Sequence, residues 1–312
     1  VLYSMKALPL SALLECLKKE VDGFAASSLF EARLAHQVLA REGGIHVTTP
    51  GLRQQEFVEL AGLCSHIAFN SLSQHQRLHA MATHYSPGLR LNPRLSFLDD
   101  DRYDPCRPHS KLGIGLEQLP ERLPGEVEGL HFHTVFACQT FLPLIATLQQ
   151  LLPLIEANPQ LRWLNIGGGY RYDLIGDQTA VIAMLQQLKR RFALEIYLEP
   201  GKAIVGNAGY LVTQVVDRFT SEGKMVLVLD TSVNHHPEVF EYQRKPELVE
   251  AEPLGTETAL LVGSTCKAGD LFGEYRFSRL PAIGQRLTFS DVGAYALIKA
   301  HRFNGYNLPD IH

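Results

Sequence analysis

The first two-thirds of the chain alternates short apolar runs with longer stretches in which apolar residues recur every three or four positions. The short runs predict eight strands, at residues 1–6, 23–27, 45–48, 66–69, 88–92, 130–134, 162–166 and 194–199. The longer stretches carry charges on the opposite face, as amphipathic helices do, and include residues 10–20, 28–42, 53–64 and 179–192. Alternating strands and helices favour a parallel sheet covered on both faces, and eight such units predict a (β/α)8 TIM-type barrel.

After about residue 205 the pattern changes. The apolar runs at residues 209–219, 224–232, 259–265 and 285–291 read as strands with no long helix between them. We therefore predict an α/β protein made of a barrel over residues 1–205 and a mostly β domain over residues 206–312. Residues 93–129, between the fifth and sixth strands, form a long segment rich in Pro, Asp and Arg, which is typical of a functional loop or an insertion.

Composition excludes several classes of function. The net charge is −4 and there is no long basic run, so we expect neither a nucleic-acid nor an anionic-membrane partner. No apolar run approaches the roughly 20 residues that span a bilayer, and no signal-peptide pattern opens the chain. The five cysteines are scattered and lack CxxC spacing. They predict a reduced, cytoplasmic protein without a disulfide framework, and no metal site is expected.

Polar residues gather at the carboxyl ends of the predicted barrel strands, where barrel active sites lie. These residues are Lys6, Ser27, Ser28, Asn70, Ser71, Arg90, Asn92, His131, His133, Gly167–Gly169, Glu199 and Gly201. Each has an ordinary explanation when taken alone. A lysine at a strand end is usually a solvated rim residue, three glycines make a tight turn, a histidine is often satisfied in the core, and a glutamate often caps the next helix.

Taken together, these residues suit an aromatic cofactor that bears a phosphate. A glycine-rich loop after the seventh barrel strand is the usual phosphate site, through backbone N–H groups and a helix N-terminus. Pyridoxal phosphate needs such a loop, a lysine for its Schiff base and a carboxylate against its pyridine nitrogen. We expect Lys6 to end a buried strand, where desolvation lowers the pKa of its amine and frees the nucleophilic form.

These residues belong to longer stretches that resemble the fold-type III pyridoxal-phosphate decarboxylases, the alanine-racemase-like barrel family. The matching stretches run in order from residue 3 to residue 305: YSMKA, DGFAASSLFEARLA, HIAFNS, GLRLNP, YDPCRPHSKLGI, GLHFHT, WLNIGGGY, YLEPGKAIV, VLDTSVNHHPEV, GSTCKAGDLFGEY and IGQRLTFSDVGAYALIKAHRFNG. YDPC with SKLGI and FNG points to the branch that decarboxylates carboxynorspermidine. The resemblance also implies that the β domain is truncated and that the family's segments at both ends of the chain are missing.

The resemblance assigns roles to the barrel residues. It implies that Lys6 is the Schiff-base lysine, that His133 stacks on the cofactor ring and acts in catalysis, and that Glu199 pairs with the pyridine nitrogen. It also implies that the cofactor contacts Gly167, Gly168, Gly169 and Gly201, and that Tyr295 contacts the phosphate.

The resemblance places further roles in the β domain and implies a homodimer with shared active sites. Cys266 would reach an active site across the dimer interface and return a proton to Cα. Asp270 is the candidate for the distal amine of the substrate. The other acidic or polar candidates for substrate binding are His235, Glu238, Glu274 and the acidic run 99–101, although a charge run of this kind is normally a solvated loop.

The implied activity is the decarboxylation of carboxynorspermidine or carboxyspermidine to norspermidine or spermidine, with pyridoxal phosphate as cofactor. Two alternatives stay open. One is a decarboxylase of another basic amino acid, such as ornithine, lysine or diaminopimelate, and the other is a relative that binds the cofactor without catalysis. A racemase is disfavoured because Cys266 stands in a decarboxylase motif, and a Schiff-base aldolase would leave the β domain without a use.

Overall fold

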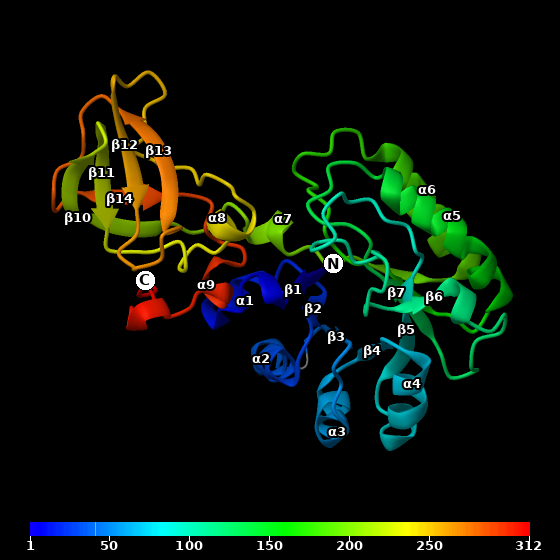
Figure 1. Cartoon of the computed structure of the whole chain (residues 1–312). Helices are drawn as coiled ribbons and strands as arrows, with labels where there is room; N and C mark the ends of the chain where they lie inside the picture. Colours follow the sequence, from blue (N-terminus) through cyan, green and yellow to red (C-terminus); the bar gives the residue numbers. More distant parts are fainter. Residues whose placement is uncertain (41) are drawn as a thin grey trace. The chain divides into compact units, whose positions relative to one another are not determined.

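The computed structural model describes residues 1–40 and 42–312, and these form two compact units (Figure 1). The first unit spans Val1–Ala203 and the second spans Ile204–His312. The boundary predicted from the sequence, after residue 205, lies two residues from this division. We describe each unit by itself.

The first unit is a nearly closed barrel of eight parallel strands. They are hydrogen-bonded in the order β1-β2-β3-β4-β5-β7-β8-β9, with the short β6 beside β5. The strands are β1 (Leu2–Ser4), β2 (Gly23–Ala26), β3 (Gly44–Thr49), β4 (His66–Phe69), β5 (Ser86–Asn92), β6 (Ile114–Gly115), β7 (Gly129–Phe132), β8 (Trp163–Asn165) and β9 (Glu195–Tyr197). Beyond β9, the carbonyls of Leu198 and Pro200 accept hydrogen bonds from the N–H groups of Leu2 and Ser4 and so join the last strand to the first.

Helices follow most of the barrel strands and lie outside them (Figure 1). They are α1 (Ser11–Leu17), α2 (Leu29–Leu39), α3 (Gln54–Leu63), α4 (Leu72–Leu78), α5 (Leu142–Ala157), α6 (Thr179–Phe192) and α7 (Lys202–Val205), with single 3-10 turns η1 (Met5–Ala7), η2 (His79–Met81) and η3 (Leu116–Gln118). The long segment after β5 holds β6 and η3 in place of an α-helix, in the interval that the sequence marked as unusual. In the described part of the chain, no helix is long and apolar enough to cross a bilayer.

The first strand ends earlier than the sequence predicts. We expected a buried strand that ends in Lys6, but β1 ends at Ser4 and Lys6 lies in the turn η1 with an exposed side chain. The backbone leaves the sheet because the N–H of Leu8 bonds to the carbonyl of Met5, which closes a 3-10 turn. Lys6 therefore stands on a turn just beyond the carboxyl end of β1.

Two neighbouring strands carry a stacked pair of histidines. His46 of β3 and His66 of β4 lie side by side in register, with ring centroids 3.9 Å apart and an angle of 18° between the rings. Burial lowers the pKa of His66 to about 4, and the nearby carboxylate of Glu128 opposes that shift only in part. Burial also holds the pKa of His46 well below its ordinary value, so both rings are neutral at pH 7.

This pair makes the stability of the protein depend on pH. Between pH 6.5 and about 4 the unfolded chain binds a proton on residue 66 that the folded chain does not, so the free energy of unfolding falls as the pH falls. For His66 alone we expect a loss of about 2 kcal/mol between pH 7 and pH 5. Urea unfolding at the two pH values should show this difference, and His66→Phe should remove most of it. His84→Phe, at an exposed position, is the control, and an unchanged difference in His66→Phe would contradict the assignment.

The second unit is a five-stranded sheet with short helical turns. Its strands, in the order β13-β12-β11-β10-β14, are β10 (Leu211–Ser221), β11 (Lys224–Leu229), β12 (Glu257–Val262), β13 (Leu271–Phe277) and β14 (Arg286–Phe289). All neighbouring pairs are antiparallel except β11 with β12. Alternate residues such as Leu211, Thr213 and Val215 of β10 are buried, so one sheet face covers the core of this unit. The helical segments are α8 (Glu238–Glu241), α9 (Ala296–Lys299) and η4 (Phe303–Gly305).

Candidate active site

The carboxyl ends of the barrel strands bring one set of the predicted residues together. Lys6 stands beyond β1, His133 follows β7 directly, Gly167–Gly169 follow β8, and Glu199 follows β9. Parallel strands place their carboxyl ends on one edge of the barrel, so four separate segments of sequence converge there. Gly201 lies against the first of them, since a Cβ on it would approach the Cβ of Ala7 to 3.0 Å.

Glu199 is the anion of this site. Its side chain is only 10% exposed, and its Oε1 accepts a hydrogen bond of 2.7 Å from Nδ2 of Asn165. Burial opposes ionisation, but His131, Lys6 and Asn165 outweigh it and hold the pKa of Glu199 well below its usual range. Nε2 of His131 lies 3.6 Å from Oε2 of Glu199, too far for a hydrogen bond. The carboxylate is thus charged, and its Oε2 faces His131 without accepting a hydrogen bond from it.

The pKa of Lys6 is lowered from its ordinary value. Burial of the amine by surrounding protein is the main cause, Arg90 adds to it, and Glu199 and Glu31 act against it. The side chain nevertheless keeps an exposed surface. The lowered pKa indicates that protein atoms replace much of the water around the amine. The exposed surface indicates that small molecules can reach the amine from the barrel mouth. Such an amine is more often neutral, and so more nucleophilic, than a surface lysine.

His133 is neutral and its tautomer is fixed. Its Nδ1 accepts a hydrogen bond of 3.1 Å from the backbone N–H of Gly168, so the ring proton lies on Nε2. Burial, together with the nearby charges of Lys6 and Arg90, holds the pKa of His133 well below its ordinary value. The ring is therefore an uncharged flat surface tied to the glycine loop.

The glycine loop is packed too tightly for side chains. Gly167 and Gly169 adopt φ values of +67° and +93°, which favour glycine, and a Cβ on Gly168 would lie 2.1 Å from the carbonyl oxygen of Glu199. The N–H of Gly167 donates to Oδ1 of Asn165, and its carbonyl accepts from the N–H of Glu199. The loop and the anion of the site are therefore one hydrogen-bonded unit.

Gly168→Ala should weaken cofactor binding by about tenfold or more, because the added Cβ forces the loop away from Glu199. That shift also lengthens the bond from the Gly168 N–H to His133. Titration of the cofactor-free protein with pyridoxal phosphate measures the effect. Gly176→Ala is the matched control, since a Cβ there meets nothing within 4 Å. Equal affinities in the two variants would show that the loop does not shape the cofactor site.

Four residues of this site were not assigned a role from the sequence. Asn165 connects Glu199 to the glycine loop, and His131 and Arg90 lie buried in β7 and β5. Both ring nitrogens of His131 and Nε of Arg90 have no hydrogen-bond partner among the described residues. Glu31 approaches from α2, where its carboxylate accepts a bond of 2.6 Å from the N–H of Ser27. For Asn165, His131 and Arg90, the sequence signal was a polar residue inside an otherwise apolar barrel strand, whereas Glu31 lies on a helix and gave no such signal.

Asp270 and His235 lie close together in the second unit. Asp270 is 4% exposed, and its carboxylate accepts bonds from the N–H of Val233 at 2.8 Å and from the N–H and hydroxyl of Thr265. Nδ1 of His235 lies 3.0 Å from the hydroxyl of Thr231, while its Nε2 has no hydrogen-bond partner among the described residues. Asp270 therefore holds the Cys266 loop in place, and its role toward a substrate stays a prediction.

The other predicted residues of the second unit come from different segments. Cys266 is exposed on the loop before Asp270, and its N–H donates to Oδ1 of Asn304. Tyr295 precedes α9 with a left-handed backbone, and Glu238 is buried at the start of α8. Glu274 pairs with Lys224 at 3.2 Å on the sheet.

The acidic run 99–101 lies on an exposed or half-exposed loop of the first unit. Asp100 forms an ion pair with Arg102 at 2.7 Å. This agrees with the interpretation of the run as a solvated loop.

The residues at the barrel mouth fit pyridoxal phosphate. Among the described residues, both ring nitrogens of His131 and Nε of Arg90 are buried without a hydrogen-bond partner, and Oε2 of Glu199 lies 3.6 Å from His131. Lys6 can attach an aldehyde, Glu199 can hold a proton on a ring nitrogen, and His133 offers an uncharged ring face. The fold and this set of residues define a barrel enzyme of the pyridoxal-phosphate class.

Comparison with known proteins narrows the class to a family. Residues 3–293 match the family model described as pyridoxal-dependent decarboxylase, C-terminal sheet domain, and the chain belongs to this family. It is 31% identical to a carboxynorspermidine/carboxyspermidine decarboxylase from Campylobacter jejuni, over 100% of this chain and 85% of that protein. It is 35% identical to a carboxyaminopropylagmatine decarboxylase from Synechocystis, over 100% of this chain and 82% of that protein.

A solved structure gives the same result. The crystal structure of the carboxynorspermidine decarboxylase from Campylobacter jejuni, complexed with norspermidine, matches with a TM-score of 0.84 and 30% identity. The match covers 99% of this chain and 84% of that one. The family and its cofactor, pyridoxal phosphate, thus agree with the expectation from the sequence.

Proposed function

We propose that this protein decarboxylates carboxynorspermidine or carboxyspermidine, forming norspermidine or spermidine in polyamine biosynthesis. The observation that carries the proposal is similarity over the whole chain to decarboxylases of these substrates, at 31% and 32% identity. The set of Lys6, His133 and Glu199 at the barrel mouth supports it, because these residues suit the cofactor that the family implies.

In this proposal each residue of the site has a separate role in the reaction. When bound, pyridoxal phosphate supplies the electron sink for the negative charge left at Cα when CO2 departs. Lys6 would hold the cofactor covalently, Glu199 would hold a proton at the ring nitrogen, and His133 would offer its uncharged face to the ring. Gly167–Gly169 and Gly201 would hold the phosphate side, and Tyr295 is a further candidate for contact with the phosphate. Cys266 returns the proton to Cα.

The same proposal assigns the substrate contacts and the assembly. Asp270, His235, Glu238 and Glu274 are the candidates for the ammonium groups of the substrate. The barrel is of the (β/α)8 TIM type, with β6 and η3 replacing one helix. We propose a cytoplasmic homodimer with shared active sites. The five scattered cysteines without CxxC spacing support a reduced compartment. Light scattering should give twice the mass of one chain, and the mass of one chain would reject the dimer.

A second candidate substrate is carboxyaminopropylagmatine, favoured by the 35% identity to the Synechocystis enzyme. Its agmatine end carries a planar guanidinium, which is best bound by a carboxylate that accepts two hydrogen bonds, whereas an ammonium needs only a point contact. The two substrates therefore place different demands on the same acidic side chains.

Product analysis tests the proposal. The purified protein with pyridoxal phosphate is supplied separately with carboxynorspermidine, carboxyspermidine, carboxyaminopropylagmatine, ornithine, lysine and diaminopimelate, and amines and CO2 are measured. We expect the highest kcat/KM for the first two. A preference for the third would support the second candidate, and a preference for the last three would reject both. Cofactor binding without CO2 from any substrate would indicate a binding protein without catalysis.

A further inference from the structure

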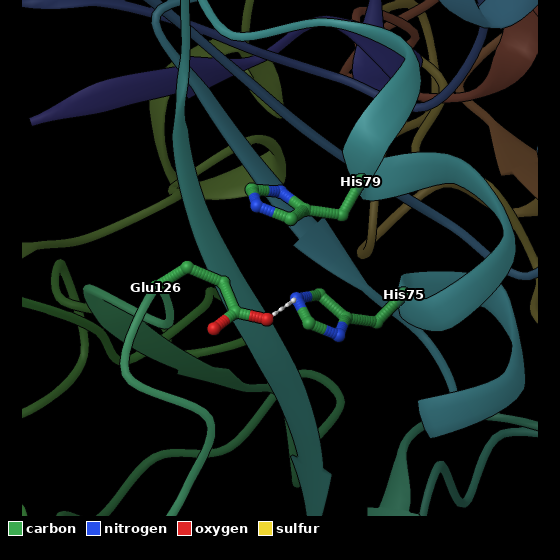
Figure 2. Close-up of side chains that lie close together, drawn as sticks. All are labelled: His75, His79 and Glu126. Atoms are coloured by element: carbon green, nitrogen blue, oxygen red, sulfur yellow. Dashed lines mark ion pairs between the residues drawn. The ribbon is translucent and has the colours of Figure 1, made fainter.

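A cluster of possible metal ligands lies away from the proposed active site. His75 of α4, His79 of η2 and Glu126 each offer one ligand atom, and these atoms all lie within 4.8 Å of one another. Figure 2 shows the two imidazoles projecting from one helical segment toward Glu126 on a facing segment. The two histidines are four residues apart, the spacing with which helices present a pair of imidazoles to a zinc ion.

The topology places this cluster at the opposite edge of the barrel from Lys6. His79 lies on the segment that leads into β5, and Glu126 lies three residues before β7. These are the amino ends of the strands, whereas the catalytic candidates stand at the carboxyl ends. A metal here would serve the fold rather than the decarboxylation.

One ring nitrogen of His75, Nε2, is buried and unsatisfied among the described residues. The residue is 3% exposed, and its Nε2 has no hydrogen-bond partner among the described residues. Oε1 of Glu126 lies 3.6 Å from this nitrogen, too far for a hydrogen bond. An unsatisfied buried nitrogen costs about 1–3 kcal/mol. A positive charge between this ring nitrogen and the carboxylate of Glu126 would satisfy both groups.

His79 already has the outer contact that metal-binding histidines use. Its Nδ1 lies 3.2 Å from the hydroxyl of Tyr85, which is 8% exposed. When Nδ1–H donates to that hydroxyl, Nε2 carries the lone pair and can bind a metal. The rings of His75 and His79 are stacked, with centroids 5.1 Å apart and an angle of 15° between them. The two imidazoles are therefore already parallel neighbours.

We propose that His75, His79 and Glu126 form a binding site for a first-row divalent metal ion, with Zn²⁺ the best fit and solvent as a fourth ligand. Two imidazoles and a carboxylate are ligands that Zn²⁺ prefers, at about 2.0–2.2 Å. The Glu126 side chain is 44% exposed. It can therefore move the short distance that brings its carboxylate within bonding distance of an ion held by the two histidines. The bound ion connects the α4–η2 segment to the segment before β7 and stabilises this edge of the barrel.

Spectroscopy with Co²⁺ tests the site independently of any activity. The untagged full-length protein is stripped of metal and titrated with Co²⁺, whose visible absorption reports coordination by protein ligands, and Zn²⁺ is added as competitor. We expect one Co²⁺ per chain, displaced by Zn²⁺, and a melting temperature that rises with Zn²⁺. Glu126→Gln and His79→Gln should each weaken binding by more than about tenfold, since loss of even an outer contact costs that much.

His84→Gln is the matched control, because this histidine is exposed in the same segment and is absent from the cluster. It should bind Co²⁺ as the unaltered protein does. Glu126 is half-exposed, so Glu126→Gln tests the site without disturbing the core. Metal held by other histidines or by cysteines would keep its affinity in both variants. That result, or the absence of a Co²⁺ band in the unaltered protein, would overturn the proposal.

Discussion

Replacing Lys6 with alanine is expected to lower kcat/KM by more than about a thousandfold, a loss of about 4 kcal/mol of transition-state stabilisation. Lys6 is the amine at the barrel mouth whose pKa is lowered by burial, and it stands on the turn η1, whose Ala7 lies against Gly201. Without it the cofactor has no covalent anchor. Two measurements check the result: CO2 release, and the mass of the protein after borohydride treatment, which fixes the cofactor on the residue that holds it.

Lys19→Ala provides the control, since Lys19 is an exposed lysine close by in the sequence. That variant should keep both the turnover and the borohydride adduct. If Lys6→Ala still formed the adduct, the anchor would be another residue and the assignment of this site would be wrong. If Lys6→Ala kept its turnover, the reaction would not depend on a covalent anchor at this position.

Most of the barrel strands were predictable because they are buried on both faces. A run such as residues 66–69 has no solvent side, and it coincides with β4. The helix over residues 179–192 was predicted with its exact ends, because its apolar stripe and charged face repeat with helical period. In both cases the burial pattern of the local segment decides the structure. Neither element needs distant contacts to be recognised.

The strand β13 escaped prediction for a physical reason. Phe272 and Tyr275 are both buried although they are three residues apart, because the ladder with β12 shifts register near Leu261. This irregularity breaks the alternation of period two by which a half-buried strand is recognised. Gly273 also adopts a φ of +136°, a backbone conformation that the local sequence pattern does not predict.

At the site, the sequence indicated the residues that carry charge but not those that position them. Asn165 is a short polar side chain in an apolar strand, and its importance appears only when β8 and β9 bring it to Glu199 and the glycine loop. His131 was noted as two residues from His133, but its place beside Glu199 depends on β9, far along the chain. Such contacts between distant segments are absent from any local pattern.

Glu199→Gln should lower kcat by about 10²–10³-fold, the usual cost of removing one charged or polar group that stabilises a transition state. The unaltered carboxylate stays ionised because His131, Lys6 and Asn165 hold its pKa down, and it can therefore keep a proton on the cofactor ring nitrogen. Glutamine keeps the shape and the bond from Asn165 Nδ2, but it has no charge to hold that proton. Steady-state kinetics with the preferred substrate measures the loss.

The same change should affect Lys6 in the opposite sense. The charge of Glu199 raises the pKa of Lys6, so removing that charge lowers the pKa further and leaves more of the amine neutral at a given pH. Glu199→Gln should therefore attach the cofactor to Lys6 at lower pH than the unaltered protein, while its turnover falls. If Glu199 had only a structural role, the substitution would impair both cofactor attachment and turnover. If cofactor attachment to Lys6 instead required a higher pH, the assignment would be contradicted. Glu195→Gln, on the exposed end of β9, should leave both measurements unchanged.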